Sequence, residues 1–172
     1  MKNKSLLVII FLLVVAVAIL GYYNQSIIAN KDQSMENPEL VIKFKSENIG
    51  TVTLETIKSL GEESFKATLR SSGAPPEEHL YTGVPMKNIL NFLDKSLLDK
   101  GKRIIVRALD GYTSVFYTKE VMEEKNVYLI YGQDGKALRS RKNRGNGPLM
   151  VVAAKDRFGQ RWCKYVIEVD IE

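Results

Sequence analysis

Hydrophobic residues follow two different patterns along the chain. An uninterrupted apolar run extends from Leu6 to Leu20, directly after Lys2 and Lys4. From about residue 40 onward, apolar residues instead alternate with polar ones or recur at helical spacing. The stretch between the two patterns is polar and ends in a proline, which is typical of a linker. The pattern therefore predicts three parts: an apolar segment over residues 1–23, a linker over 24–38 and a globular domain over 39–172.

Helical spacing of apolar residues occurs in three parts of the globular domain. In the first, Leu54, Ile57 and Leu60 share one face, and Thr51 or Thr53 can cap the helix. The second begins after a proline that suits a first helical turn, and a glycine follows its last residue. Helices are predicted over residues 54–60, 86–100 and 119–125.

Alternation of apolar and polar residues predicts strands through the rest of the domain. Asp-Gly pairs at 110–111 and 134–135 indicate tight turns between neighbouring strands. The proline-rich stretch 73–83 is expected to be a loop. In the final strand, the residues expected to face the core are Cys163, Tyr165, Ile167, Val169 and Ile171. The strands are predicted over residues 40–45, 65–69, 103–109, 112–118, 126–132, 136–140, 149–155 and 161–172.

The order of these elements indicates the fold class. Strands follow one another through short turns, and helices do not alternate regularly with strands, which argues against a doubly wound parallel sheet. We predict an α+β domain with mixed, mainly antiparallel sheets and two or three helices laid on them, preceded by an N-terminal transmembrane helix.

The apolar segment admits two interpretations. Leu6–Tyr23 contains 18 residues, which is at the short end of what spans a membrane. A cleaved signal peptide is the alternative, because Ala16-Val17-Ala18 resembles a cleavage site, although it lies inside the apolar run. A retained anchor accounts better for the length of the run. In both cases the basic flank stays inside, so we expect a single-pass protein of the cell membrane with an extracytoplasmic C-terminal domain.

Charge and composition narrow the class of partner. The formal net charge is +5. Without Lys2 and Lys4, 23 basic residues face 20 acidic ones, which leaves about +3 on the remainder. This mild excess, in an exported domain, does not indicate nucleic acid as a partner.

The sequence offers no residue set for a zinc or hydrolytic centre. One His and one Cys cannot form a usual zinc site, which needs three or four such ligands. No Gly-x-Ser-x-Gly motif is present, so His79 is expected to be a surface or packing residue. Cys163 is expected to be a small buried hydrophobic residue. We therefore assign no catalytic residue and no metal ligand.

A basic stretch is the main candidate for ligand binding. Arg139, Arg141, Lys142 and Arg144 lie within six positions and precede two glycines. Arginine binds phosphate in a bidentate manner, and glycine lets backbone N–H groups approach an anion. The alternative is an ordinary solvated loop.

Four stretches in sequence carry a family resemblance. They are YTGVPMKNIL (81–90), VRALDGYTSVFYTKE (106–120), VYLIYGQDGKAL (127–138) and GPLMVVAAKDRFGQRWCKYVIEVDI (147–171). Together they resemble the oxidoreductase molybdopterin-binding domain, the fold of the sulfite oxidase family, over about residues 40–172. The resemblance implies a molybdopterin-type cofactor whose terminal phosphate the four basic residues could meet.

The resemblance fails at the residue that matters most for the metal. In that family a cysteine thiolate of a Thr-Leu-x-Cys-x-Gly segment binds molybdenum, and the matching position here is Ser71. A hydroxyl is a harder donor than a thiolate and loses its proton at much higher pH. We therefore expect no molybdenum, and we place the cofactor-binding candidates at Ser71, Arg139, Arg141, Lys142 and Arg144.

These observations lead to one predicted function and one alternative. We predict a membrane-tethered domain with a molybdopterin-binding fold that serves as a non-catalytic binding or assembly module at the cell surface. Its partners would be the membrane, through the N-terminal helix, and a small anionic ligand or a membrane protein. The alternative is a molybdopterin-dependent oxidoreductase that passes electrons to a membrane partner.

Overall fold

The computed structural model describes residues 8–22, 38–71, 73 and 75–172. The chain forms two separate units, residues 1–36 and 37–172. In the first unit, residues 8–22 are helical with exposed side chains. Within the described residues, no helix combines the length and the apolar character needed to cross a bilayer. The expected linker, 24–38, lies outside the described residues except for its last position.

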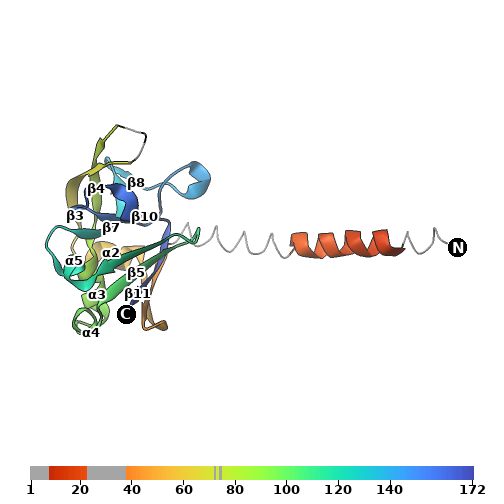
Figure 1. Cartoon of the computed structure of the whole chain (residues 1–172), viewed down its shortest axis with the longest axis horizontal. Helices are drawn as coiled ribbons and strands as arrows, with labels where there is room; N and C mark the ends of the chain where they lie inside the picture. Colours follow the sequence, from red (N-terminus) through yellow and green to blue (C-terminus); the bar gives the residue numbers. More distant parts are fainter. Residues whose placement is uncertain (1–7, 23–37, 72, 74) are drawn as a thin grey trace. The chain divides into compact units, whose positions relative to one another are not determined.

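The second unit is built on two sheets (Figure 1). The first has five strands in the order β2-β1-β11-β5-β6, and the second has the order β10-β9-β7-β4-β3 with β8 paired to β7. All pairs are antiparallel except β1 with β11, which is parallel. The first sheet consists of β1 (Glu39–Phe44), β2 (Glu47–Thr53), β5 (Arg103–Ala108), β6 (Thr113–Tyr117) and β11 (Val166–Ile171). The second consists of β3 (Glu63–Leu69), β4 (Glu77–Pro85), β7 (Val127–Gln133), β8 (Lys136–Ala137), β9 (Met150–Ala153) and β10 (Cys163–Lys164).

The two sheets share one hydrophobic core. Ile42, Val106 and Val169 enter it from the first sheet, and Leu129 and Val151 enter it from the second. Each of these side chains is fully buried. Because strand side chains alternate between faces, the period-2 pattern of the sequence was sufficient to locate most of these strands.

Four helices accompany the sheets, rather than the two or three expected. The predicted helix over 86–100 is divided, because Asp94 accepts hydrogen bonds from the backbone nitrogen and the hydroxyl of Ser96, at 2.8 and 2.7 Å. Side-chain bonds of this kind compete with helical ones. Thr53 caps the first helix through the Thr56 nitrogen. The helices are α2 (Leu54–Ser59), α3 (Met86–Leu93), α4 (Leu97–Lys100) and α5 (Thr118–Met122), with 3₁₀ turns η1 (Arg141–Asn143) and η2 (Gly159–Arg161).

The expectation of a loop over 73–83 is wrong for most of that stretch. Residues 77–85 form β4, the longest strand, which pairs with β3 on one side and β7 on the other. The two prolines precede the strand, where no ladder hydrogen bond is lost. His79 therefore lies on a strand, and its Nδ1 is 2.8 Å from Asp134 Oδ2.

The final predicted strand is two strands in different sheets. Tyr165 has a φ of 56° and separates β10 from β11, so the chain passes from the second sheet to the first at this residue. A register shift follows between Val166 and Glu168. As a result Tyr165 and Ile167 do not face the core as expected, whereas Val166 does. Cys163, Val169 and Ile171 are buried as predicted.

A buried carboxylate stabilises the first sheet through charged neighbours. Asp170 of β11 is fully buried. Arg107 Nη1 lies 3.2 Å from Asp170 Oδ2 and also contacts Glu168. The Ser46 nitrogen donates to Asp170 Oδ1 at 3.1 Å. Lys43 pairs with Glu168 at 2.7 Å, so the network links three neighbouring strands.

We expect Arg107→Met to lower the free energy of unfolding by about 2–3 kcal/mol, because it leaves Asp170 buried without a counter-charge. Lys66→Met is the matched control, since Lys66 and Glu78 form an exposed pair at 3.0 Å that contributes under about 1 kcal/mol. Urea unfolding of both variants measures the difference. Equal losses would show that the Arg107 network has no special role.

Candidate functional site

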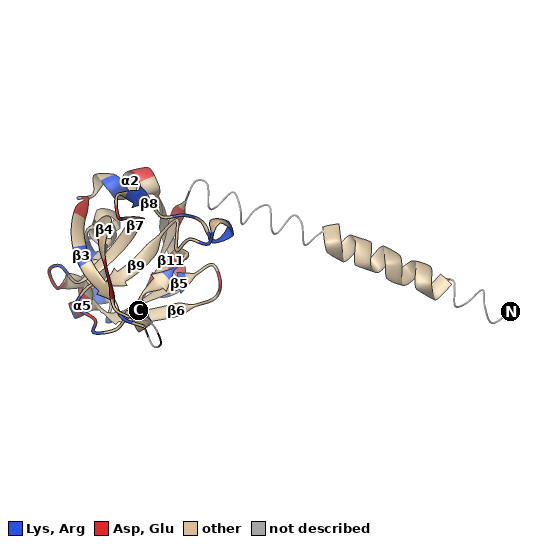
Figure 2. Cartoon of the chain, turned by 90° about the horizontal axis from the view of Figure 1, so that it is seen from above, with Lys and Arg blue, Asp and Glu red and all other residues tan. Residues whose placement is uncertain are grey.

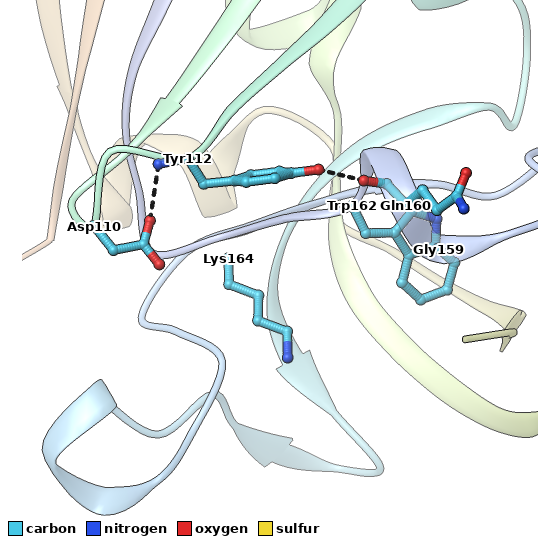
Figure 3. A pocket seen from close by; sticks show the side chains of 6 residues that line it. All are labelled: Asp110, Tyr112, Gly159, Gln160, Trp162 and Lys164. Atoms are coloured by element: carbon cyan, nitrogen blue, oxygen red, sulfur yellow. Dashed lines mark hydrogen bonds between the residues drawn. The ribbon is translucent and has the colours of Figure 1, made fainter. Parts of the chain in front are cut away.

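A small cleft lies where the second sheet meets the turn between β5 and β6. Its volume is about 300 Å³. Asp110 and Tyr112 come from that turn, Gly159 and Gln160 from η2, Trp162 from the residue after η2, and Lys164 from β10 (Figure 3). Segments about fifty residues apart in the sequence therefore form its two sides.

Tyr112 forms one wall and joins the two sides of the cleft. Its backbone nitrogen donates to the Asp110 carboxylate at 3.1 Å, and Gly111 has a φ of 89° that allows the tight turn. The Tyr112 hydroxyl donates to the Gln160 carbonyl (Figure 3). This bond fixes the aromatic ring across the opening of the cleft.

Trp162 forms the opposite wall and is almost completely buried. Its indole nitrogen donates to the Ala153 carbonyl at 3.0 Å. Its ring meets that of Tyr81 edge to face, with centroids 5.7 Å apart. Because the polar nitrogen is satisfied inside the protein, the indole offers the cleft an apolar surface only.

The 3₁₀ turn η2 is positioned by a strong ionic cluster. Arg161 pairs with Glu120 at 2.8 Å and, through Nε, with Asp156 at 2.8 Å. These hydrogen bonds raise the pKa of Arg161 and lower that of Glu120. Arg161 also donates to the Val115 carbonyl on edge strand β6, at 3.4 Å. The guanidinium of Arg161 is therefore occupied by Glu120, Asp156 and the Val115 carbonyl and is not available to a ligand phosphate.

Lys164 is the cation that remains at the cleft. It is exposed on β10, and no carboxylate pairs with it among the residues that the structure describes. Asp110 places a negative charge at the same cleft. The site thus combines two aromatic walls, one amine and one carboxylate, which suits a small planar molecule that carries an acidic group and N–H donors.

Ser71 does not line this cleft. It is exposed and follows the end of β3, where the Gly159 nitrogen donates to the neighbouring Arg70 carbonyl at 3.1 Å. A Cβ on Gly159 would lie 2.4 Å from Leu69 Cδ1, so the turn packs closely against this strand. Ser71 thus directly follows a residue that bonds to the cleft residue Gly159, but Ser71 itself does not line the cleft.

The four basic residues predicted from the sequence lie on a separate surface. Arg139, Lys142 and Arg144, with Asn143, line an exposed space of about 430 Å³ that has no residue in common with the cleft. The guanidinium of Arg141 lies 5.9 Å from the centroid of the Tyr165 ring. The structure therefore does not bring Ser71 and the basic residues together in either pocket.

The glycines of this stretch serve packing rather than anion binding. The Gly145 nitrogen donates to the Ser140 carbonyl at 3.0 Å, and the Gly147 nitrogen donates to the Arg139 carbonyl at 2.9 Å. A Cβ on Gly145 would lie 2.1 Å from the Arg139 carbonyl oxygen. The two glycine N–H groups are therefore not available for the expected anion cradle.

Cys163 has the properties expected of a buried hydrophobic residue. Burial, helped by the charge of Asp110, raises the pKa of its thiol to about 12. The thiol therefore stays protonated at neutral pH. In the described part of the chain, no group of three or more His, Cys, Asp or Glu side chains could hold a metal ion.

Comparison with known proteins identifies the fold. The chain is similar to a chain in the crystal structure of the sulfane dehydrogenase SoxCD from Paracoccus pantotrophus, with a TM-score of 0.62 and 20% sequence identity. The match covers 77% of this chain and 37% of the other, so the chain corresponds to little more than a third of that protein's length. No protein-family model matches the sequence. No curated protein matches it either. The similarity supports the fold expected from the sequence and says nothing of activity.

Sequence reasoning missed the cleft although it noted several of its residues. The Asp-Gly-Tyr turn and the lysine of the last strands contributed to the family resemblance. Their meeting with Gln160 and Trp162 depends on how the two sheets pack, which local sequence patterns do not report. The basic stretch could be predicted as a candidate because its four charges lie within six positions of the sequence.

We expect Cys163 in the folded full-length chain to react with Ellman's reagent at least about 100-fold more slowly than in the urea-unfolded chain at pH 8. The raised pKa removes the reactive thiolate, and burial blocks the reagent. The variant Asn143→Cys is the control, because it adds an exposed thiol that should react quickly. A native Cys163 that reacts as fast as this added thiol would contradict the account.

Proposed function

We propose that this chain is an exported, membrane-tethered protein whose molybdopterin-binding-like domain is a non-catalytic binding module. The apolar run Leu6–Tyr23, behind Lys2 and Lys4, supports a retained single-pass anchor with the C-terminal domain outside the cell. Residues 8–22 of this run are helical, with exposed apolar side chains.

The side-chain atoms available to bind molybdenum support a non-catalytic role. A molybdenum centre of the family type needs a soft thiolate, and the matching residue is the hydroxyl of Ser71. The single cysteine of the chain is fully buried on β10, with its pKa raised to about 12. These residues do not fit molybdenum.

The cleft supports binding of a small planar organic anion. Tyr112 and Trp162 offer aromatic surfaces, and Lys164 offers a positive charge for an acidic substituent. Asp110 can accept N–H donors of a heterocycle. A volume of about 300 Å³ is at the low end for small-molecule sites, so we propose one fused ring system rather than a larger ligand. A metal-free pterin belongs to this class.

The alternative is a molybdopterin-dependent oxidoreductase that passes electrons to a membrane partner. The similarity of the fold to a sulfane dehydrogenase chain favours it. It requires a ligand for the metal that the side chains at positions 71 and 163 do not supply. The binding module therefore agrees better with the residues present.

Trp162 provides a direct test, because it is the single tryptophan of the chain and lines the cleft. We expect pterin-6-carboxylate to change the fluorescence of Trp162 saturably in the full-length protein. Lys164→Gln should weaken this binding about 10-fold, because it removes a charge-assisted hydrogen bond.

Lys136→Gln is the matched control, since it removes an exposed lysine of β8 outside the cleft. It should leave the affinity unchanged. Either no saturable change with the wild-type protein, or equal weakening by both variants, would refute binding in this cleft.

A further inference from the structure

The stretch 139–144, hereafter the basic loop, groups four basic residues within six positions, namely Arg139, Arg141, Lys142 and Arg144. Within the described residues, no carboxylate pairs with Arg139, Arg141 or Arg144. Figure 2 shows this basic segment in blue on the domain. Eight other cationic side chains do have carboxylate partners, namely those of Lys43, Lys66, Lys87, Lys100, Arg103, Arg107, Lys155 and Arg161. Three arginines without a carboxylate partner among the described residues are therefore grouped in this one short loop.

The loop is also a well-defined structural unit. It closes on itself through hydrogen bonds from the Asn143 and Arg144 nitrogens to the Ser140 and Arg141 carbonyls, both at 3.0 Å. The Tyr165 hydroxyl donates to the Gly145 carbonyl at 2.8 Å and fixes the base of the loop. A loop held in this way fixes the backbone positions from which the charged side chains project, so little backbone conformational entropy is lost when it binds.

We propose that the basic loop docks the domain on the surface of an anionic lipid bilayer. This inference rests on the membrane tether of the proposed function. Residues 24–38, fifteen in number, separate the apolar segment from the first strand. A chain of this length spans at most about 50 Å when fully extended, so the tether keeps the domain close to the bilayer. Basic residues near an anionic surface are attracted within about a Debye length.

The arrangement of the loop favours an extended anionic surface over a single small anion. All four basic side chains are exposed, and the glycine N–H groups that could surround a phosphate are bonded within the loop. A surface of many lipid phosphates can meet several separated cations at once, whereas one phosphate needs convergent donors.

The test uses the full-length protein reconstituted in vesicles, with a fluorophore on Asn143→Cys. Buried Cys163 should escape labelling. Nitroxide lipids should quench the label more strongly in vesicles that contain about one-third phosphatidylglycerol than in phosphatidylcholine alone. The difference should disappear in about 1 M salt. A label on Lys100→Cys, in α4 at the other end of the domain in Figure 1, should show no such difference.

Charge variants identify the residues responsible. The triple variant Arg139→Gln, Arg141→Gln, Arg144→Gln should lower the ratio of docked to undocked protein about 100-fold, at roughly 5-fold per residue. The control Lys95→Gln, Lys102→Gln, Lys119→Gln removes equal charge from other exposed positions and should leave docking unchanged. Equal loss in both variants, or equal quenching in the two lipid mixtures, would overturn the proposal.

Two further measurements distinguish lipid docking from small-anion binding and from a failure of the membrane tether. Millimolar inorganic phosphate at constant ionic strength should not reverse the quenching, and reversal would indicate a small-anion site instead. If alkaline carbonate extracts the protein from neutral vesicles, the tether fails. Docking is then measured by itself, as salt-sensitive co-sedimentation of the full chain with anionic vesicles. Loss of this co-sedimentation in the triple arginine variant would support docking through the basic loop. Failure of the wild-type chain to co-sediment, or no loss in the variant, would refute it.

Discussion

The two side chains of strand β10 point in opposite directions, and this alternation decides what the site can do. Cys163 points into the core, where its thiol is shielded and protonated, while Lys164 points out beside the cleft. The strand is kept in register by pairing with β9, and Tyr165, with its positive φ, sends the chain to the other sheet directly afterwards. The only thiol is therefore withheld from any ligand, and an amine is presented in its place.

The ionic cluster of Arg161 connects this strand to the rest of the fold. It holds η2 against α5 and against the edge of β6, and the Tyr112 hydroxyl bonds to the same turn. The cleft consequently has walls from both sheets and cannot form until they pack together. By contrast, the basic loop is closed by its own backbone and stands apart from the cleft. The domain thus has two separate candidate sites, the cleft and the basic loop, which we propose serve a small ligand and a lipid surface.

Much of the fold could be predicted from the sequence because strands and helices bury one face. Alternation located β5, β6, β7 and β9, and helical spacing with a threonine cap located α2. The errors have local physical causes that a period-based analysis does not detect. Asp94 ended a helix through its own side chain, and β4 formed directly after two prolines. The candidate site was less predictable, since Asp110, Tyr112 and Lys164 meet only through tertiary packing. The charges of the basic loop could be recognised in the sequence because they lie within six positions.

We propose that a hard oxygen donor at position 71 and a buried thiol at 163 leave this domain without a molybdenum ligand. The most direct measurement is molybdenum per chain, by mass spectrometry of the metal, in full-length protein purified from a host that makes molybdopterin. A sulfite oxidase-fold enzyme from the same host confirms that cofactor is supplied. We expect far less than one molybdenum per ten chains, whereas a ratio near one, with the metal bound through a protein side chain, would show that the domain does hold a molybdenum ligand.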